Sequence, residues 1–193
     1  MQDVDLIDAV ASRLEEGLRS IGLTQTLVVQ RYQPTQQGVP SEDSVWLEKL
    51  FDHVHGSPEI NHFFKPLENT YNEMETQVYV TTFQVSALFA QTPGDTSKPT
   101  ASDVANYLKR FITSRETIRQ FKKKGLSFFR VTDVRNVKFS DDMSQFEAFP
   151  AFDIAIVHNN SLTSVIGAAT SWRTKIVSIG GEFGPVKDDT SAD

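Results

Sequence analysis

The stretch from Glu73 to Ala90 places the tightest constraint on the fold, because two sets of side chains alternate along it. Side chains of a β-strand point alternately to the two faces of a sheet, so the alternation predicts a strand. Both sets are partly apolar, which indicates a central strand. At about 3.3 Å per residue it would be long enough to project beyond a small core. The first set is Gln77, Tyr79, Thr81, Phe83, Val85, Ala87 and Phe89, and the second is Val78, Val80, Thr82 and Leu88.

Further strand signals occur before and after this segment. They are runs of β-branched, aromatic or alternating residues bounded by turn residues. Two of them flank the turn Ser140–Ser144 and predict a β-hairpin, and a short last strand follows later. The predicted strands are Thr24–Tyr32, Ser44–His55, Leu126–Phe139, Gln145–His158 and Trp172–Ile179.

Several breaks separate the predicted strands. Gly56-Ser57-Pro58 should end the strand Ser44–His55, in which the apolar residues alternate poorly enough to predict a bulge. Residues 59–72 mix apolar residues with proline and asparagine, and they predict a long loop or arm of functional importance. Asn159-Asn160-Ser161 predicts a turn. Polar loops are expected at Pro34–Pro40 and Gln91–Pro99.

Two helices are predicted. The first has apolar residues at three-to-four spacing from Leu6 to Ile21. The second runs from Thr100 to Lys124, with Thr100 and Asp103 forming a capping-box-like start. Gly125 should end it in a left-handed conformation.

These elements predict an α+β fold, with an antiparallel or mixed β-sheet that carries a long β-hairpin arm and packs against an N-terminal helix and a long central helix. Residues 1–160 should form a single domain with its arm at residues 44–72. Residues 161–193 should form a C-terminal extension with a short strand and a flexible acidic tail from residue 180.

Composition excludes several classes of protein. The chain has 193 residues, no cysteine and a net charge of −6. The lack of cysteine excludes disulfides and thiolate metal sites. An acidic chain is not expected to bind nucleic acid generally, although acidic walls suit a channel through which DNA slides. The longest apolar runs fall short of the about 20 residues that a membrane span needs.

Candidate catalytic and metal sites are weak. His53 and His55 would share a face of a strand, but a third ligand would have to come from Glu59 or His62. A polar face on an exposed arm is the favoured interpretation. Asp141-Asp142 fits a hairpin turn better than a cation site. We therefore predict no catalytic residue, no cofactor and no metal site.

Contact surfaces are better supported. A basic cluster lies at the end of the second helix. Charge that complements the helix dipole on a solvated face is the favoured interpretation, and contact with DNA or with an acidic neighbour is the alternative. Aromatic residues fall in the strand Ser44–His55 and in the arm, where exposed apolar side chains usually mark a protein–protein contact. Folding of the aromatic rings back into the core is the alternative. The candidate interface residues are Trp46, Phe51, Phe63, Phe64, Arg115, Arg119, Lys122, Lys123 and Lys124.

The order of elements resembles that of tailed-phage neck and tail-terminator proteins. The resemblance covers roughly residues 3–158, with no diagnostic short motif. It departs from the family pattern in the long aromatic arm and in the C-terminal extension. The matching segments are Leu6–Ile21, Thr26–Gln33, Glu75–Ala90, Ser102–Lys124, Phe128–Phe139 and Phe146–Val157.

This resemblance implies a structural virion protein that forms a ring, expected to be a hexamer, at the head-proximal end of a phage tail. The ring would cap the tube, join it to a neck or connector protein above, and contact tube and sheath protein below. DNA would pass through its lumen. No enzyme activity and no membrane partner are implied, and assembly would take place in the host cytoplasm.

Other hypotheses are another neck ring (a connector, stopper or collar protein), a small metal-dependent enzyme using His53 and His55, and a monomeric assembly chaperone or adaptor.

Overall fold

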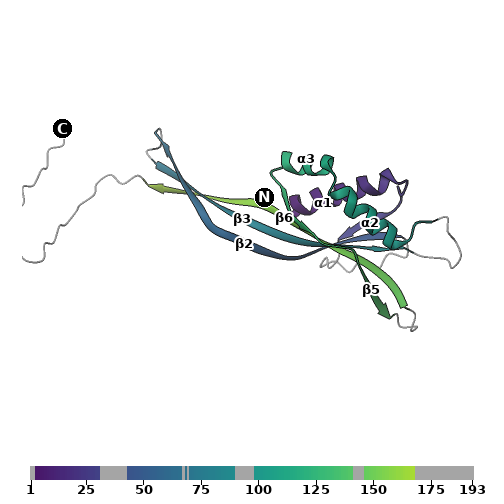
Figure 1. Cartoon of the computed structure of the whole chain (residues 1–193). Helices are drawn as coiled ribbons and strands as arrows, with labels where there is room; N and C mark the ends of the chain where they lie inside the picture. The colour runs from purple at the N-terminus through teal and green to yellow at the C-terminus, as the bar shows by residue number, and fades with distance from the viewer. Residues whose placement is uncertain are drawn as a thin grey trace, which may run out of the picture.

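The computed structural model of the chain describes residues 3–30, 43–66, 68, 70–89, 98–140 and 146–167. The elements confirm the predicted α+β class with a mixed sheet, a long hairpin and an N-terminal helix (Figure 1). The helices are α1 (Asp3–Ser20), α2 (Ala101–Ile112) and α3 (Arg115–Lys123). The strands are β1 (Leu27–Gln30), β2 (Ser44–Lys65), β3 (Thr70–Leu88), β4 (Ser127–Val131), β5 (Arg135–Ser140) and β6 (Phe146–Gly167).

The six strands form one sheet in the order β1-β2-β3-β6-β4, with β5 also pairing to β6. The β1–β2 pair is parallel, and all other pairs are antiparallel. β3 is therefore central, as its two partly apolar faces predicted. Its pairing with β6 runs without a register shift from Ser86↔Ala151 to Thr70↔Gly167.

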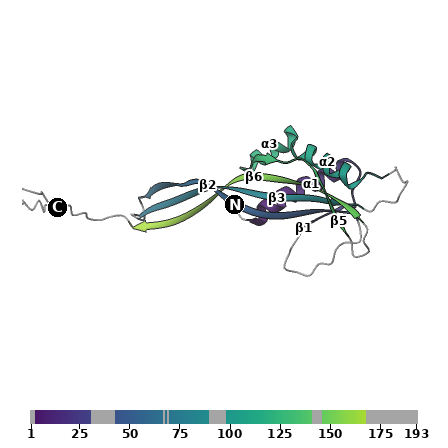
Figure 2. The same ribbon diagram turned by 60° about the horizontal axis from the view of Figure 1, so that its bottom comes forward.

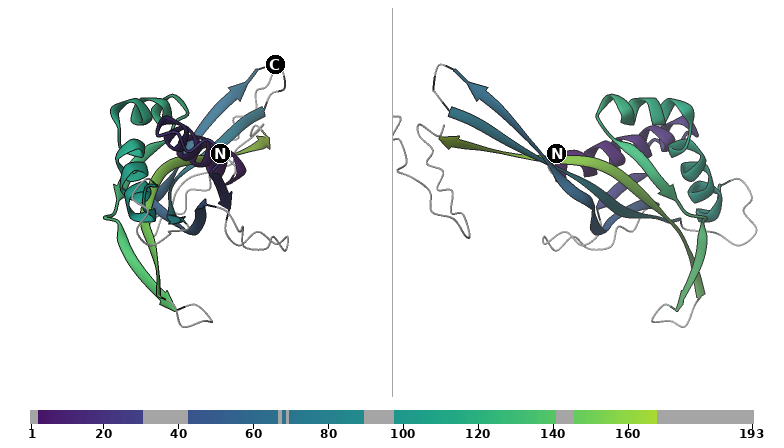
Figure 3. Two further views of the ribbon diagram at one scale, coloured as in Figure 1. Left: turned by 90° about the vertical axis from the view of Figure 1, so that its right-hand side faces the viewer. Right: turned by 60° about the vertical axis from the view of Figure 1, so that its left-hand side comes forward.

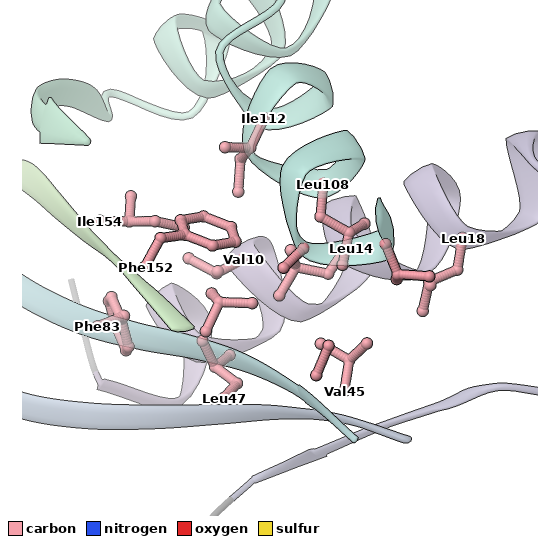
Figure 4. Close-up of a cluster of buried hydrophobic side chains, with 14 of the residues drawn as sticks. Val10, Leu14, Leu18, Val45, Leu47, Phe83, Leu108, Ile112, Phe152 and Ile154 are labelled. Atoms are coloured by element: carbon pink, nitrogen blue, oxygen red, sulfur yellow. The ribbon is translucent and has the colours of Figure 1, made fainter. Parts of the chain in front are cut away.

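The hydrophobic core lies between the sheet and the helices, which gather over one face of its broad end (Figure 1 and Figure 2). Phe83 and Val85 of β3 stand beside Ile154 and Phe152 of β6, so all four belong to this face. The amphipathic stripes of α1 and α2 pack onto it (Figure 4). The helical core residues in that view are Val10, Leu14, Leu18, Leu108 and Ile112.

α1 and α2 approach each other closely at Gly17. A Cβ atom added there would lie 3.0 Å from Cδ2 of Leu108 and 3.0 Å from Cδ1 of Phe111. Because Gly17 has no side chain, α2 can pack closely against α1 at this point.

The prediction of one helix over Thr100–Lys124 is wrong in one respect, because this segment forms two helices, α2 and α3. Its ends are confirmed: Thr100 and Asp103 form a capping box, and Gly125 has a φ of 74°. The break arises at Ser114, which is extended and accepts a hydrogen bond from the Thr117 backbone N–H at 3.3 Å. The Thr117 hydroxyl donates a hydrogen bond of 3.0 Å to the Phe111 carbonyl oxygen. This side chain thereby satisfies a carbonyl group in the last turn of α2.

The predicted end of β2 at Gly56-Ser57-Pro58 is also wrong, because β2 continues to Lys65. Register shifts occur between Lys49 and Phe51, where a bulge was expected, and between His55 and Glu59. Gly56 has a φ of 73°, which lets the backbone bulge. Pro58 has no N–H, but β2 is an edge strand here and loses no ladder bond.

The turn expected at Asn159–Ser161 is a third error, since β6 passes straight through to Gly167. The hairpin predicted at Leu126–Phe139 and Gln145–His158 is confirmed for β5 and β6. Its first predicted strand is not continuous, however, because it is divided into β4 and β5. There the Thr132 hydroxyl accepts a 2.8 Å hydrogen bond from the Asp153 N–H and replaces a ladder bond.

Other expectations fall outside the described residues. They concern the loop Pro34–Pro40, residues 91–97, the turn at 141–144, the strand Trp172–Ile179 and the tail from residue 180. The strand predicted at Thr24–Tyr32 is present as β1, which begins only at Leu27 and is described as far as Gln30. Residues 31 and 32 lie outside the described residues. Among the described helices, none is long and apolar enough to cross a membrane.

Candidate functional site

Three strands leave the helix-covered body together and form a long projection (Figure 1 and Figure 3). We call this projection the arm, and define it as residues 53–65 of β2, 70–79 of β3 and 159–167 of β6. Every described residue from 51 to 60 is exposed. The arm is therefore a continuation of the sheet beyond its helical cover.

The arm carries exposed apolar side chains along its length. At the tip, Phe64, Tyr71 and Ile166 form one cross-strand row, and the rings of Phe64 and Tyr71 lie 4.9 Å apart. Ile60 and Leu162 flank Glu75 in a second row. Both rows lie on the face that the helices cover in the body, because Tyr71 and Glu75 share parity with the core residue Phe83.

The opposite face of the arm is also partly apolar. Phe63 and Val165 stand on either side of Asn72. The exposed fraction is 54% for Phe63 and 50% for Phe64. Two adjacent phenylalanines thus point to opposite faces, and folding of these rings into the core, the alternative considered from sequence, is excluded.

A polar network holds the root of the arm to the body. The Lys49 ammonium contacts carboxylate oxygens of Asp3 and Asp52, each at 2.6 Å. The Thr81 hydroxyl donates to Asp52 Oδ1 at 2.6 Å and lies 2.9 Å from Nε2 of the buried His158. Since the single Thr81 proton goes to Asp52, the His158 Nε2–H donates to Thr81.

This network shifts several pKa values. Partial burial raises the pKa of Asp52, but hydrogen bonds from Lys49 and Thr81 outweigh it, and the net pKa lies below the usual value. Burial lowers the pKa of Lys49, yet the hydrogen bonds to Asp3 and Asp52 leave it raised overall. Burial lowers the pKa of His158, so its imidazole stays neutral near pH 7.

The structure places the aromatic candidates along β2. Trp46 is half-buried within the body, and Phe51 is 58% exposed beside the first bulge. Phe63 and Phe64 lie at the far end of the arm. These residues therefore do not form one cluster, although three of the four are exposed.

The basic candidates lie on the body. Arg115, Arg119, Lys122 and Lys123 are exposed on α3, and Lys124 follows as its C-cap. α3 turns Thr117 and Phe121 inward, which leaves these cations on its outer side. The aromatic and basic groups are two separate surfaces.

The candidate metal ligands are divided between the two faces of the arm. His53 and His55 stand opposite Val80 and Val78, whereas His62 stands opposite Glu73 on the other face, 3.0 Å from its carboxylate. Glu59 lies on the face of His53 and His55. Across the described residues, no group of three or more His, Cys, Asp or Glu side chains could hold a metal ion.

Sequence reasoning missed the contribution of β6 to the arm. Because a turn was predicted at Asn159–Ser161, the exposed residues Leu162, Val165 and Ile166 were not recognised as part of a strand. These three residues do not alternate, so the available signal was the β-branched content of Thr163, Val165 and Ile166, which favours a strand.

Together, a small helix-covered core and a long apolar arm define a structural assembly protein. The chain belongs to the family of the E217 gateway protein gp29, whose model matches residues 5–168. This membership confirms the resemblance to phage neck and tail proteins, and with it the prediction of a structural protein that is not an enzyme.

One solved structure similar to this chain is the sheath/tube terminator of the extracellular contractile injection system PVC in its extended state. The identity is 9% and the TM-score 0.49, over 95% of this chain and 66% of that chain. The present chain thus spans about two thirds of the length of that protein. No curated protein matches the chain.

Proposed function

We propose that this protein forms a homo-hexameric ring at the head-proximal end of a phage tail, where it caps the tube and joins it to the neck. Family membership supports a role in the phage tail. The observation that carries the proposal is the arm, which exposes large apolar side chains far from the core that stabilises the fold. An exposed apolar surface of this kind is expected to be covered in an assembly.

Ring closure needs two different complementary surfaces on each subunit. The arm would reach across to a neighbouring subunit, and the cationic outer side of α3 would make a second, separate contact with a neighbour. Arg115, Arg119 and Lys122 are candidates to meet acidic residues of a neighbour. Exposed ion pairs of this kind contribute little each, about 0–1 kcal/mol, so the apolar arm should dominate the stability of the ring.

The lumen of such a ring would pass DNA without holding it. The net charge of −6 is compatible with this property, since an acidic wall would repel the phosphate backbone. The proposed partners are a neck or connector ring above the protein and tube protein below it, together with sheath protein in a contractile tail. The protein would reside in the virion after assembly in the host cytoplasm.

Native mass spectrometry of the purified protein, alone and with tail tubes, tests the ring. The expected species is a multiple of 21.6 kDa corresponding to six chains. The variant Phe63→Ser/Phe64→Ser should abolish this species, whereas Phe129→Ser should leave it intact. Phe129 is a matched control because it is 67% exposed but lies on β4 of the body.

Two further observations separate the alternatives. Mass spectrometry of purified virions should detect the chain, and its absence would favour an assembly chaperone. Cryo-electron microscopy of the neck should place it directly on the tube. Density one ring higher would assign it to a connector or stopper position, and monomers under all conditions would contradict the proposal.

A further inference from the structure

The sheet has uncovered edges along the arm. In the body, β1 covers β2 at Ser44–Leu47, and β5 and β4 pair with β6 as far as Val157. Among the described strands, residues 59–65 of β2 and 160–167 of β6 pair only with β3, which lies between them. Each arm therefore presents two outer edges with unused backbone donors and acceptors.

The two edges differ in their protection. On the β2 edge such protecting features lie only at the ends, with Pro58, the bulge and Glu59 before residues 60–64 and Lys65 after them. Residues 160–167 of β6 contain no charged residue and no proline, and they keep an unbroken register with β3. Soluble proteins normally protect an edge with such features, so an unprotected edge indicates that another strand covers it in the assembly.

The strand directions restrict what that strand can be. β2 and β6 are both antiparallel to β3, so they run parallel to each other. In a ring whose subunits are arranged head to tail, every arm points the same way, and β6 of one copy can face β2 of the next as a parallel pair. Pairing of two β6 edges would need a two-fold axis, which a head-to-tail ring lacks.

The apolar residues on the two edges match in position. Ile60 and Phe64 of β2 lie level with Leu162 and Ile166 of β6 on one face. On the opposite face, Phe63 lies level with Val165. A neighbour set level with the first copy would therefore place apolar beside apolar on both faces, which stabilises adjacent strands.

We propose that residues 160–167 of one copy pair in parallel with residues 59–65 of the next copy, which closes the arms into a continuous barrel. This inference rests on the proposed ring and specifies one of its interfaces. Closure removes every free edge of the arm, which is how barrels solve the edge problem.

Cysteine cross-linking tests the pairing, because the natural chain has no cysteine. Asn61 and Thr163 both stand opposite Met74, on either side of β3. Within one copy they are two strand spacings apart, about 9–10 Å, which exceeds the roughly 7 Å limit for a disulfide. In Asn61→Cys/Thr163→Cys, a disulfide can therefore form only between copies.

After oxidation with diamide, the double variant should give a ladder of covalent oligomers that ends at the number of subunits in the ring. Mixed single variants should stop at dimers. As a test that does not depend on register, Leu162→Lys should turn rings into monomers in native mass spectrometry, whereas Phe129→Lys should not.

Three outcomes would overturn the pairing. Rings that form normally in Leu162→Lys, together with no cross-link in the double variant, would refute the edge contact and leave the ring itself standing. Dimers from Thr163→Cys alone would show β6–β6 pairing instead. Absence of any ring from the natural chain would overturn the proposed function and this inference together.

Discussion

Gln77 of β3 bridges to Gly56 of β2, with its side-chain Nε2 donating a hydrogen bond of 3.2 Å to the Gly56 carbonyl oxygen. The same nitrogen lies 3.0 Å from the carbonyl oxygen of His55. Both carbonyls lie where the register shifts between His55 and Glu59. A side chain therefore replaces missing ladder bonds, and β2 continues to the tip of the arm.

Replacing Gln77 by alanine should loosen the arm beyond the bulge. The loss of each hydrogen bond costs about 0.5–1.5 kcal/mol. Hydrogen–deuterium exchange should become faster in residues 59–65 and remain unchanged in α1. Thr76→Ala is the control, since its hydroxyl contacts Ser161 at 3.1 Å on the other face. Equal exchange in the two variants would refute the role of Gln77.

Gly17→Ala should destabilise the body although alanine favours helices. The gain in helix propensity is about 1 kcal/mol, whereas forcing a methyl group against Leu108 and Phe111 costs roughly 1–3 kcal/mol. Urea denaturation should therefore show a lower free energy of unfolding.

A double-mutant cycle tests the cause of that loss. Leu108→Ala alone should cost about 2–5 kcal/mol, because Leu108 is fully buried. In Gly17→Ala/Leu108→Ala the total should be less than the sum, since the shortened side chain makes room for the new methyl group. Additive losses would show that the two side chains do not compete for the same space.

Ser114→Ala should lower the free energy of unfolding by about 1 kcal/mol, because the N-cap of α3 is lost. Ser114→Asn should retain most of the stability, since asparagine is also a good N-cap residue. Thermal unfolding followed by circular dichroism measures both. If alanine were neutral here, the hydroxyl would not be what starts the second helix.

Stability should fall as the pH drops below about 6.5, the ordinary pKa of histidine. Burial lowers the pKa of His158 in the folded state, so the unfolded chain binds a proton that the folded chain does not. The lowered pKa of Asp52 adds a further loss only at more acidic pH, below its usual range.

The variant His158→Gln isolates the histidine contribution. Its free energy of unfolding, measured by urea denaturation from pH 7.5 to pH 5, should depend less on pH than that of the natural chain. Identical slopes would show that His158 does not account for the pH dependence of stability.

Local chemistry in the sequence determined much of the fold. The three-to-four spacing of Leu6, Val10 and Leu14 defined the buried face of α1. The Thr100 cap and Gly125 marked the outer ends of the helical segment, because capping bonds and left-handed backbone depend on neighbouring residues. The alternation after Glu73 identified the central strand for the same reason. The exposed Phe63 and Phe64 were also identified as contact candidates.

Only the tertiary structure decided that β2 and β6 continue beyond their predicted ends. Gly56-Ser57-Pro58 and Asn159-Asn160-Ser161 carry local signals for a stop, and both strands pass through them. The hydrogen bonds that hold these segments extended come from β3, which is distant in sequence from β6, and from the side chain of Gln77. Local signals contain no information about such a partner. The sequence therefore determined that an aromatic arm exists, and cross-strand pairing decided its third strand, its two faces and its open edges.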